Sequence, residues 1–566
     1  MPISRRRSSL TTRMKVRSVE ITGKIGKHKW SYIVGDREHS IAPVSADQQT
    51  TINRSSLRRS SVNYLVFTAC ASIYLLPFMR LLLAGTDEGT LVEGAVRVLH
   101  GQVFARDFFE VMGPGTFYWL AAFLKLFGAT FFAERVCLFV TSLGTFLLMY
   151  YLSRRVCRRY QISPPIFLAG VYFSNIWPMV NHHVDSNFFA LLSIACIVLW
   201  KDTRKNLLLL AAGAGAGITT CILQPKGILL LLAFFLWLWI QRRRQASQSL
   251  LWLVAAGYFG LVGLMLLYFW SRGALRDLLY INLVWPYQNY GAVNAIPYAR
   301  GLLQYWTHWA APIHGVRWLI PLAVVLFAPF LLIAVLPALV LLLAIPHGKH
   351  NLRPEILLYW LCGWALWLSE VHRRDISHLI SGSPLLIILC IHFLAEYRGK
   401  IADLSLQLLS VCAVALATVN LFLVLSAHPF QTRVGTVVVF KPDPVLTFLD
   451  THVPAGTEIF TYPYCPVYYF FSATTNPTRY SLLMYNYNTA SQFHDAIRTL
   501  DQRKVRYVVW DTKFEAEAAH LFTAVSFQPA GGFIMEPYLA SHYRVVRDLG
   551  GMQILERKPD GSAAQH

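Results

Sequence analysis

The sequence predicts a polytopic α-helical membrane protein that ends in a mixed α/β domain. Of its 566 residues, 55% are hydrophobic and only 14% are charged, whereas about 25% of the residues of a soluble globular protein are charged. The hydrophobic residues also stand in long runs, and a helix needs about 20 such residues to cross a bilayer. Beyond residue 426 the runs become short and rich in β-branched and aromatic residues, which is typical of α/β domains.

Residues 1–60 form a basic tail. They hold 13 Lys and Arg against 4 Asp and Glu, in a chain whose net charge is +21. We expect this tail to be disordered, cytosolic and close to anionic membrane lipids. A nucleic-acid-binding arm is the alternative, but no nucleic-acid-binding fold accompanies it, so we predict no nucleic-acid partner.

Residues 61–426 predict about eleven transmembrane helices. Because positive charge stays on the cytosolic side, the alternating basic turns place the N-terminus in the cytosol and residues 427–566 outside it, at a plasma membrane or bacterial inner membrane. The 318–345 run is long and contains three prolines, so it counts as one helix or two. The segments lie at 63–84, 133–152, 164–180, 186–200, 206–223, 227–241, 250–270, 318–345, 355–370, 382–396 and 404–426.

The loop after the first segment is unusually acidic. Asp87 and Glu88 follow the first apolar run, and Asp107 and Glu110 come about twenty residues later. The short apolar stretch 116–127 would leave four arginines outside if it crossed, so we expect it to lie along the outer interface, with Tyr118 in the aromatic belt. Carboxylates held there indicate chemistry at the membrane face. The alternative is that Asp87 and Glu88 only cap a helix.

Other ionisable residues stand at the outer ends of later segments. His183 and Asp185 precede a span, Lys226 lies between two apolar helices, and Arg373 and Arg374 break the positive-inside trend. Ionisable groups at membrane depth are costly and usually functional. The structural alternatives are that Lys226 reaches up to the headgroups and that His183 is a satisfied interfacial residue.

With these residues in view, the chain resembles the polytopic GT-C glycosyltransferases, in the branch of the protein O-mannosyltransferases, aminoarabinose transferases and rhizobial lipopolysaccharide glycosyltransferases. The resemblance covers roughly residues 63–426. It rests on Asp87-Glu88 after the first span, the aromatic juxtamembrane helix, the segment His183–Asn187, and about eleven spans followed by an outer domain. One departure is Met112-Gly113-Pro114-Gly115, where the family often has a Lys-Pro-Pro-Leu run. The cation expected there must therefore come from elsewhere.

The resemblance implies an inverting glycosyltransferase whose donor is a sugar on a polyprenyl phosphate. A carboxylate removes the proton of an acceptor hydroxyl, on a glycan, lipid or protein, and cations stabilise the phosphate as it leaves. Asp87 is the expected general base, with Glu88 as its substitute. Lys226, Arg373 and Arg374 are the expected phosphate ligands.

A divalent metal is a further expectation. Asp185 with Glu88 or His183 offers the carboxylate and imidazole ligands that suit several ions. His183 and Asp185 are two residues apart, so they share an ion only if the backbone there is extended.

The remaining acidic and aromatic residues are expected to bind or guide substrate. Asp107, Glu110 and Tyr118 are assigned to a substrate-binding loop. The C-terminal domain holds no paired carboxylates and no nucleophile motif, so we expect it to guide the acceptor rather than perform the chemistry.

Two other classes stay open. A transporter or flippase of lipid-linked sugars would need charged groups along a path through the bilayer rather than on one face. A polysaccharide polymerase or ligase would also use a large outer loop, but an acid pair after the first span is not its expected mark. Convergence of Asp87, Asp185, Lys226 and Arg373 in space favours the transferase. The sugar, the acceptor and the metal requirement are not determined by the sequence.

Overall fold

The structure is a computed structural model of the whole chain. It divides into two units, residues 1–65 and residues 66–566. The residues that it describes are 16–21, 28–33, 46–82, 86–157, 162–176, 178–242, 249–290, 296, 298, 320–345, 353–396, 399–518, 529 and 531–559.

The first unit contains two strands and the start of a helix where the sequence predicts a disordered tail. Strands β1 (Val16–Ile21) and β2 (His28–Ile33) pair antiparallel, with Val16 opposite Ile33. Both runs are rich in the β-branched and aromatic residues that favour strands, which explains the difference. Helix α1 (Ala46–Leu75) begins in this unit.

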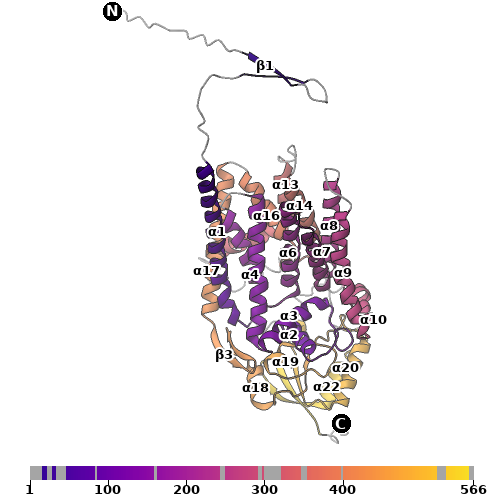
Figure 1. Cartoon of the computed structure of the whole chain (residues 1–566). Coiled ribbons are helices and arrows are strands. Elements are labelled where there is room, and N and C mark those ends of the chain that lie inside the picture. The colour runs from indigo at the N-terminus through magenta and orange to yellow at the C-terminus, as the bar shows by residue number, and fades with distance from the viewer. Residues whose placement is uncertain are drawn as a thin grey trace, which may run out of the picture. The chain divides into compact units, whose positions relative to one another are not determined.

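The second unit is mostly helical, as the sequence predicts. Each of the eleven predicted segments contains a helix over its described residues, and the proline-containing run 318–345 holds one, α13. In Figure 1 the long helices run side by side. After α1 and the 3₁₀ turn η1 (Leu76–Arg80) come α2 (Thr86–Leu99), α3 (Pro114–Phe127), α4 (Phe131–Val156), α5 (Ser163–Ile176), α6 (His182–Thr203), α7 (Leu207–Ile222), α8 (Gln224–Arg242), α9 (Ser249–Ser271), α10 (Leu275–Leu279), the π-helical turns η3 (Tyr280–Val284) and η4 (Pro286–Tyr290), α13 (Ile320–Ala344), α14 (Pro354–Glu370), α15 (Ile376–Ser381), α16 (Pro384–Glu396) and α17 (Lys400–Leu425).

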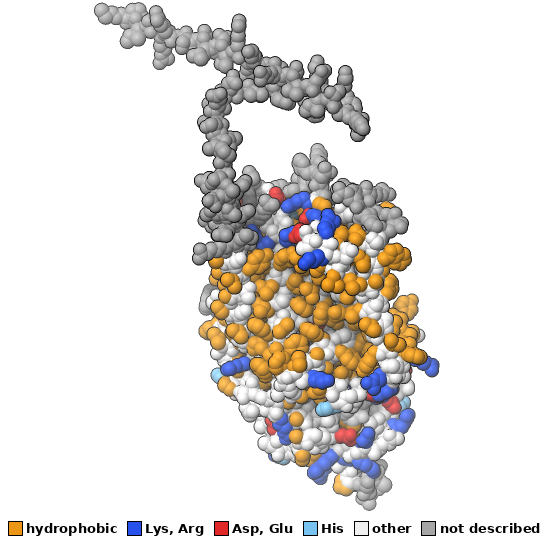
Figure 2. Space-filling model, in the orientation of Figure 1, with side chains coloured by type: hydrophobic (Ala, Val, Ile, Leu, Met, Phe, Trp, Pro, Cys, Tyr) orange, Lys and Arg blue, Asp and Glu red, His pale blue; other side chains and the backbone are white. Residues whose placement is uncertain are grey.

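The helices are those of a membrane protein. Figure 2 shows a belt of hydrophobic side chains over the helical part, with Lys and Arg gathered on either side of it. A bilayer requires such a belt, because its hydrocarbon core offers no partners for polar groups. Among the described residues, six helices are long and apolar enough to cross a membrane: Ser61–Arg80, Phe131–Val156, His182–Thr203, Gln224–Gln241, Ser249–Ser271 and Lys400–Leu425.

The C-terminal residues form two small sheets with short helices. A four-stranded sheet has the order β5-β6-β8-β7, in which β5 and β6 are parallel and the other pairs antiparallel. Strands β4, β5 and β6 lie in the short runs of β-branched and aromatic residues that predict an α/β domain. The elements are β3 (His428–Thr432), β4 (Gly435–Val439), α18 (Pro444–His452), β5 (Ile459–Tyr462), α19 (Val467–Phe471), α20 (Ala490–Gln502), β6 (Tyr507–Asp511), α21 (Phe514–Ala518), α22 (Met535–His542), β7 (Tyr543–Asp548) and β8 (Met552–Arg557).

The C-terminal elements share one hydrophobic core with α2 and α3. Phe104, Phe117, Val467 and Val508 are all buried in it, and Figure 1 shows α2 and α3 between the lower end of α4 and α19. A Cβ on Gly89 of α2 would lie 2.3 Å from the backbone nitrogen of Val467. The described C-terminal elements therefore belong to the same compact unit as the helices and pack directly against the acidic loop.

Candidate active site

Asp87 lies in the first turn of α2, where the unpaired N–H groups of a helix favour a carboxylate. Its Oδ1 accepts a 2.6 Å hydrogen bond from the hydroxyl of Tyr464, which lies between β5 and α19. Tyr464 is buried, whereas Asp87 is only partly buried. The carboxylate is therefore held in one place while part of it stays accessible.

Glu88, the other predicted acid, points elsewhere. Neighbouring helical residues are rotated by about 100° around the helix axis. Glu88 is fully buried, and its Oε1 lies 2.6 Å from Nη2 of Arg135 in α4. Arg135 also contacts Glu134 at 3.2 Å and donates a 2.7 Å hydrogen bond to the carbonyl of Leu81. Glu88 thus joins α2 to α4, and of the two acids only Asp87 has an accessible oxygen.

Arg373 brings positive charge to Asp87. It follows α14, and its Nε donates a 2.7 Å hydrogen bond to Oδ2 of Asp375. Burial opposes the charged form, yet Asp375, Tyr290 and Asp87 together raise the pKa of Arg373 above its ordinary value. The guanidinium is therefore close enough to Asp87 for the two charges to interact. Arg374 is exposed at the same turn.

Lys226 lies in the first turn of α8 and is completely buried. Its Nζ is 2.8 Å from Oε1 of Glu370. It also donates hydrogen bonds of 3.0 Å to Ser186 Oγ and 2.9 Å to Asn187 Oδ1. Glu370 is in turn 3.2 Å from Nδ1 of His183. The ammonium charge is thus balanced inside the protein rather than presented to a ligand.

The residues predicted to hold a metal are occupied by protein contacts. Asp185 accepts a 2.5 Å hydrogen bond from Thr116 of α3. Because α6 begins at His182, His183 and Asp185 lie on a helix, and the extended backbone that a shared ion requires is not present. Nowhere in the described part of the chain do three or more His, Cys, Asp or Glu residues stand as a metal site. The divalent ion stays a prediction.

Glu110 is the member of the predicted substrate loop that lies near Asp87. It is buried, and Ser481 Oγ donates a hydrogen bond to its Oε1. Burial raises the pKa of Glu110 to about 8, and the neighbouring carboxylates of Glu93 and Asp87 act in the same direction. The carboxyl group of Glu110 is therefore protonated at neutral pH.

The other two loop residues support the loop itself. Asp107 pairs with Arg106 at 2.8 Å and accepts a 2.7 Å hydrogen bond from the backbone nitrogen of Val103. The hydrogen bond from Arg106 holds the pKa of Asp107 below its ordinary value. The hydroxyl of Tyr118 lies 3.3 Å from that of Tyr268 in α9. Asp107 therefore stabilises the loop itself, and Tyr118 joins α3 to α9.

The start of α3 explains the departure from the family pattern. A Cβ on Gly113 would lie 2.4 Å from the carbonyl oxygen of Cys221. Only glycine permits this close approach, so the segment that often carries a cation in the family is used here to pack α3 against the end of α7.

Three site residues were not singled out by sequence reasoning. Asp375 and Glu370 flank the arginines, and an acid at the end of an apolar helix is a weak signal for a buried partner of Lys226. Tyr464 carries no signal of its own, because it lies in an aromatic stretch whose commonest role is in a core.

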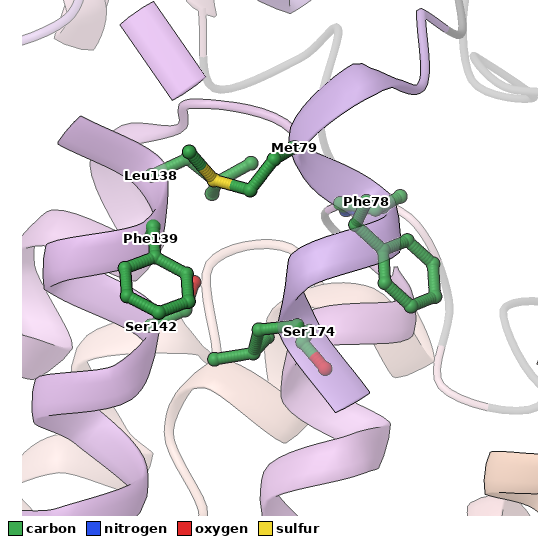
Figure 3. Close-up of a pocket in the computed structure, with 8 residues that line it drawn as sticks. Phe78, Met79, Leu138, Phe139, Ser142 and Ser174 are labelled. Carbon is green, nitrogen blue, oxygen red and sulfur yellow. The ribbon is translucent and has the colours of Figure 1, made fainter. Parts of the chain in front are cut away.

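A small pocket lies apart from these charges, between η1, α4 and α5. Figure 3 shows Leu138, Phe139 and Ser142 on one side of it and Phe78 and Met79 on the other. A neighbouring pocket shares Ser142 and Ser174 and is lined by Asn187 as well. The first pocket is apolar apart from its two serines, which suits a hydrocarbon chain better than a sugar.

Comparison with known proteins identifies the fold. No family model and no curated protein matches this chain. ArnT from Cupriavidus metallidurans, bound to undecaprenyl phosphate, matches with a TM-score of 0.54 and 12% identity, over 89% of this chain and 99% of that one. The archaeal oligosaccharyltransferase AglB from Archaeoglobus fulgidus, in complex with an inhibitory peptide and a dolichol-phosphate, matches with a TM-score of 0.50 and 13% identity, over 88% of this chain and 74% of that one. This protein therefore has the GT-C-like fold that its sequence resembles.

Proposed function

We propose that this protein is an inverting glycosyltransferase that moves a sugar from a polyprenyl phosphate to an acceptor hydroxyl at the outer face of the membrane. The observation that carries the proposal is the partly exposed carboxylate of Asp87, held by Tyr464 within electrostatic range of the guanidinium of Arg373. Transfer from a phosphate-linked sugar needs a base for the acceptor and a cation for the leaving group. Two proteins of this fold, ArnT and AglB, have been observed with undecaprenyl phosphate and a dolichol-phosphate.

In the proposed reaction Asp87 removes the proton from the acceptor hydroxyl. The oxygen attacks the anomeric carbon from the side opposite the phosphate, and the bond between that carbon and the phosphate oxygen breaks. The electron pair of this bond leaves with the polyprenyl phosphate, so the configuration inverts. Arg373 and the exposed Arg374 stabilise the growing charge, because a guanidinium can grip phosphate with two parallel hydrogen bonds.

Lys226 supports this arrangement from inside the protein. Its partner Glu370 is the last residue of α14, and the backbone nitrogen of Arg373 donates a 3.2 Å hydrogen bond to the carbonyl of Glu370. The buried ion pair therefore fixes the turn that carries Arg373. In this proposal the predicted phosphate contact of Lys226 becomes an indirect one.

The position of the buried charges favours a transferase over a transporter. Within the described ranges, the buried charged residues on the long helices lie at the starts of α4, α6 and α8 and at the end of α14, beside α2. Successive helices run in opposite directions. The starts of α4, α6 and α8 therefore lie at the same end of the bundle as the end of α14. A transporter of charged lipid-linked sugars would need such groups along the whole path.

The test is transfer by the purified protein in lipid nanodiscs. A panel of synthetic polyprenyl-phosphate sugars serves as donor, and cell-envelope lipids and glycans serve as acceptors. We expect donor consumption by the wild type and a loss of about 10²–10⁴-fold in Asp87→Asn, which keeps the shape but removes the base. The matched control is Asp202→Asn, an exposed acid near the end of α6, at the opposite end of this helix from Asp185, which should keep its activity.

Two results would contradict the proposal. One is near-normal transfer by a folded Asp87→Asn protein, and the other is movement of intact donor across a sealed membrane without any transfer. The sugar and acceptor are identified separately, by mass analysis of lipid-linked sugars and envelope glycans in a strain that lacks the protein. We expect that strain to accumulate the donor and to lack one sugar on the acceptor.

A further inference from the structure

We propose that Tyr464 is a positioning residue for Asp87, so that the C-terminal segment completes the active site instead of only guiding the acceptor. The inference rests on the proposed function, because it concerns the base of that reaction. It is carried by the hydrogen bond from the Tyr464 hydroxyl to Asp87 Oδ1, which joins two residues 377 positions apart at 2.6 Å.

The backbone around this hydrogen bond is tightly packed. The space that a Cβ on Gly89 would need is filled by the backbone of Pro466 and Val467, at 2.3–2.9 Å. Gly89 is two residues from Asp87, and Pro466 is two residues from Tyr464. Because glycine lets the two backbones touch, main-chain contact holds the segment that carries Tyr464 against the turn of α2 that carries Asp87.

The hydroxyl of Tyr464 also stays in the protonated form that can donate a hydrogen bond. Burial, with the added negative charge of Asp87, raises the pKa of Tyr464 well above its ordinary value. The hydroxyl therefore keeps its proton at any pH at which the enzyme would work. The hydroxyl of Thr90, one turn along α2, hydrogen-bonds the same phenol oxygen. This leaves the Tyr464 proton for Asp87.

A general base needs such a restraint. Rotation of an aspartate carboxylate about its last side-chain bond is soft, and small misplacements of a catalytic group are costly in rate. Tyr464 fixes Oδ1, and Oδ2 takes no hydrogen bond from the residues that the structure describes. In this arrangement Tyr464 holds Oδ1 of Asp87, and Oδ2 is available to accept the proton of the acceptor hydroxyl.

The experiment compares two tyrosines of the same stretch. Tyr464→Phe removes the hydrogen bond to Asp87. Tyr468→Phe removes a similar, partly buried hydrogen bond, 3.1 Å long, to Oδ2 of Asp443, which caps α18. Both rings stay, so both variants lose one hydroxyl and one carboxylate contact. The measurements are kcat, donor binding to the full-length protein in nanodiscs, and the midpoint of thermal unfolding.

We expect Tyr464→Phe to lower kcat by about 10- to 100-fold, the range for a lost hydrogen bond to a charged group. Donor binding should stay unchanged, and the unfolding midpoint should match that of Tyr468→Phe, which keeps its kcat. Thr90→Val should lower kcat less, by under about 10-fold, and provides a second test if Tyr464→Phe does not fold.

Other outcomes overturn the inference. Normal kcat in Tyr464→Phe, or equal losses of kcat in both tyrosine variants, would reduce Tyr464 to a packing residue, as would normal kcat in Thr90→Val if that were the only folded variant. Failure of the proposed function looks different, because Asp87→Asn would then keep its activity. An inactive Asp87→Asn beside a fully active Tyr464→Phe contradicts this inference alone.

Discussion

Two charged regions at the same end of the helices are built in opposite ways. Around Lys226 and Glu370 each charge is completely buried and each has an opposite charge or a hydrogen-bond partner within about 3 Å. Around Asp87 and Arg373 the charges keep part of their surface exposed, and Asp87 has one fixed oxygen. Removing one partner of a buried pair that is closed in this way destabilises the protein, because the other charge is left uncompensated, whereas a restrained but accessible charge is available for chemistry.

This comparison gives different roles to the two acids that follow the first span, Asp87 and Glu88. Asp87 belongs to the accessible region, and Glu88, its neighbour in sequence, belongs with Arg135 and Glu134 in a second closed cluster. Mutations in the closed clusters should therefore lower the stability of the protein, and mutations in the accessible region should lower its activity. The predictions below test this division, beginning with the largest expected effect.

Lys226→Met should destabilise the protein by about 3–5 kcal/mol, the usual cost of breaking a buried ion pair. The mutation leaves the carboxylate of Glu370 buried beside His183 without the ammonium that balances its charge. The measurement is unfolding in detergent or nanodiscs. The control is Lys201→Met, which breaks the partly exposed pair with Glu355 and should change little. Normal stability with a loss of donor binding would instead return Lys226 to the phosphate site.

Glu88→Gln should destabilise by less, about 1–3 kcal/mol. Two carboxylates share one guanidinium here, so Arg135 keeps Glu134 as an ionic partner after the change. The activity of Glu88→Gln per folded molecule should fall far less than that of Asp87→Asn. Asp87→Asn, by contrast, should lose activity and keep its unfolding midpoint. The division fails if Glu88→Gln is stable yet as inactive as Asp87→Asn.

Arg373→Lys should raise the KM for the donor about tenfold, or about 1.4 kcal/mol. Lysine keeps the charge but offers a point contact where arginine can hold phosphate with two parallel hydrogen bonds. The KM for the acceptor should not change. Arg374→Lys, at the exposed neighbouring position, should have a smaller effect. Equal donor KM values in the wild type and Arg373→Lys would make this arginine an interfacial anchor.

Part of this picture follows from the sequence alone. Long apolar runs predict the helices because a bilayer forces each span to satisfy its own hydrogen bonds. Arg373 is recognisable because it breaks the charge bias. By contrast, the sequence does not separate Asp87 from Glu88, since one position along a helix decides which faces the site. The contact of Tyr464 with Asp87 depends on packing between distant parts of the chain, and no local pattern encodes it.

Glu110 provides the most specific test, because it is a buried acid near the carboxylates of Glu93 and Asp87 and the guanidinium of Arg97. Burial raises its pKa to about 8 from an ordinary value of 4.5. Between these two values the folded protein keeps a proton that the unfolded chain releases. The stabilising effect of this proton is therefore complete below about pH 4.5 and is lost as the pH rises through about 8.

The unfolding midpoint of the wild type should accordingly fall between pH 5 and pH 8. Glu110→Gln is neutral at every pH and can still accept the hydrogen bond from Ser481, so this slope should become shallower. Asp107→Asn should leave the slope unchanged, since the pKa of Asp107 is lowered and its titration lies below this range. Equal slopes in the wild type and Glu110→Gln would mean that Glu110 is ionised in the folded protein. A second charged carboxylate would then stand beside Asp87, and the accessible region would hold two acids able to take a proton instead of one.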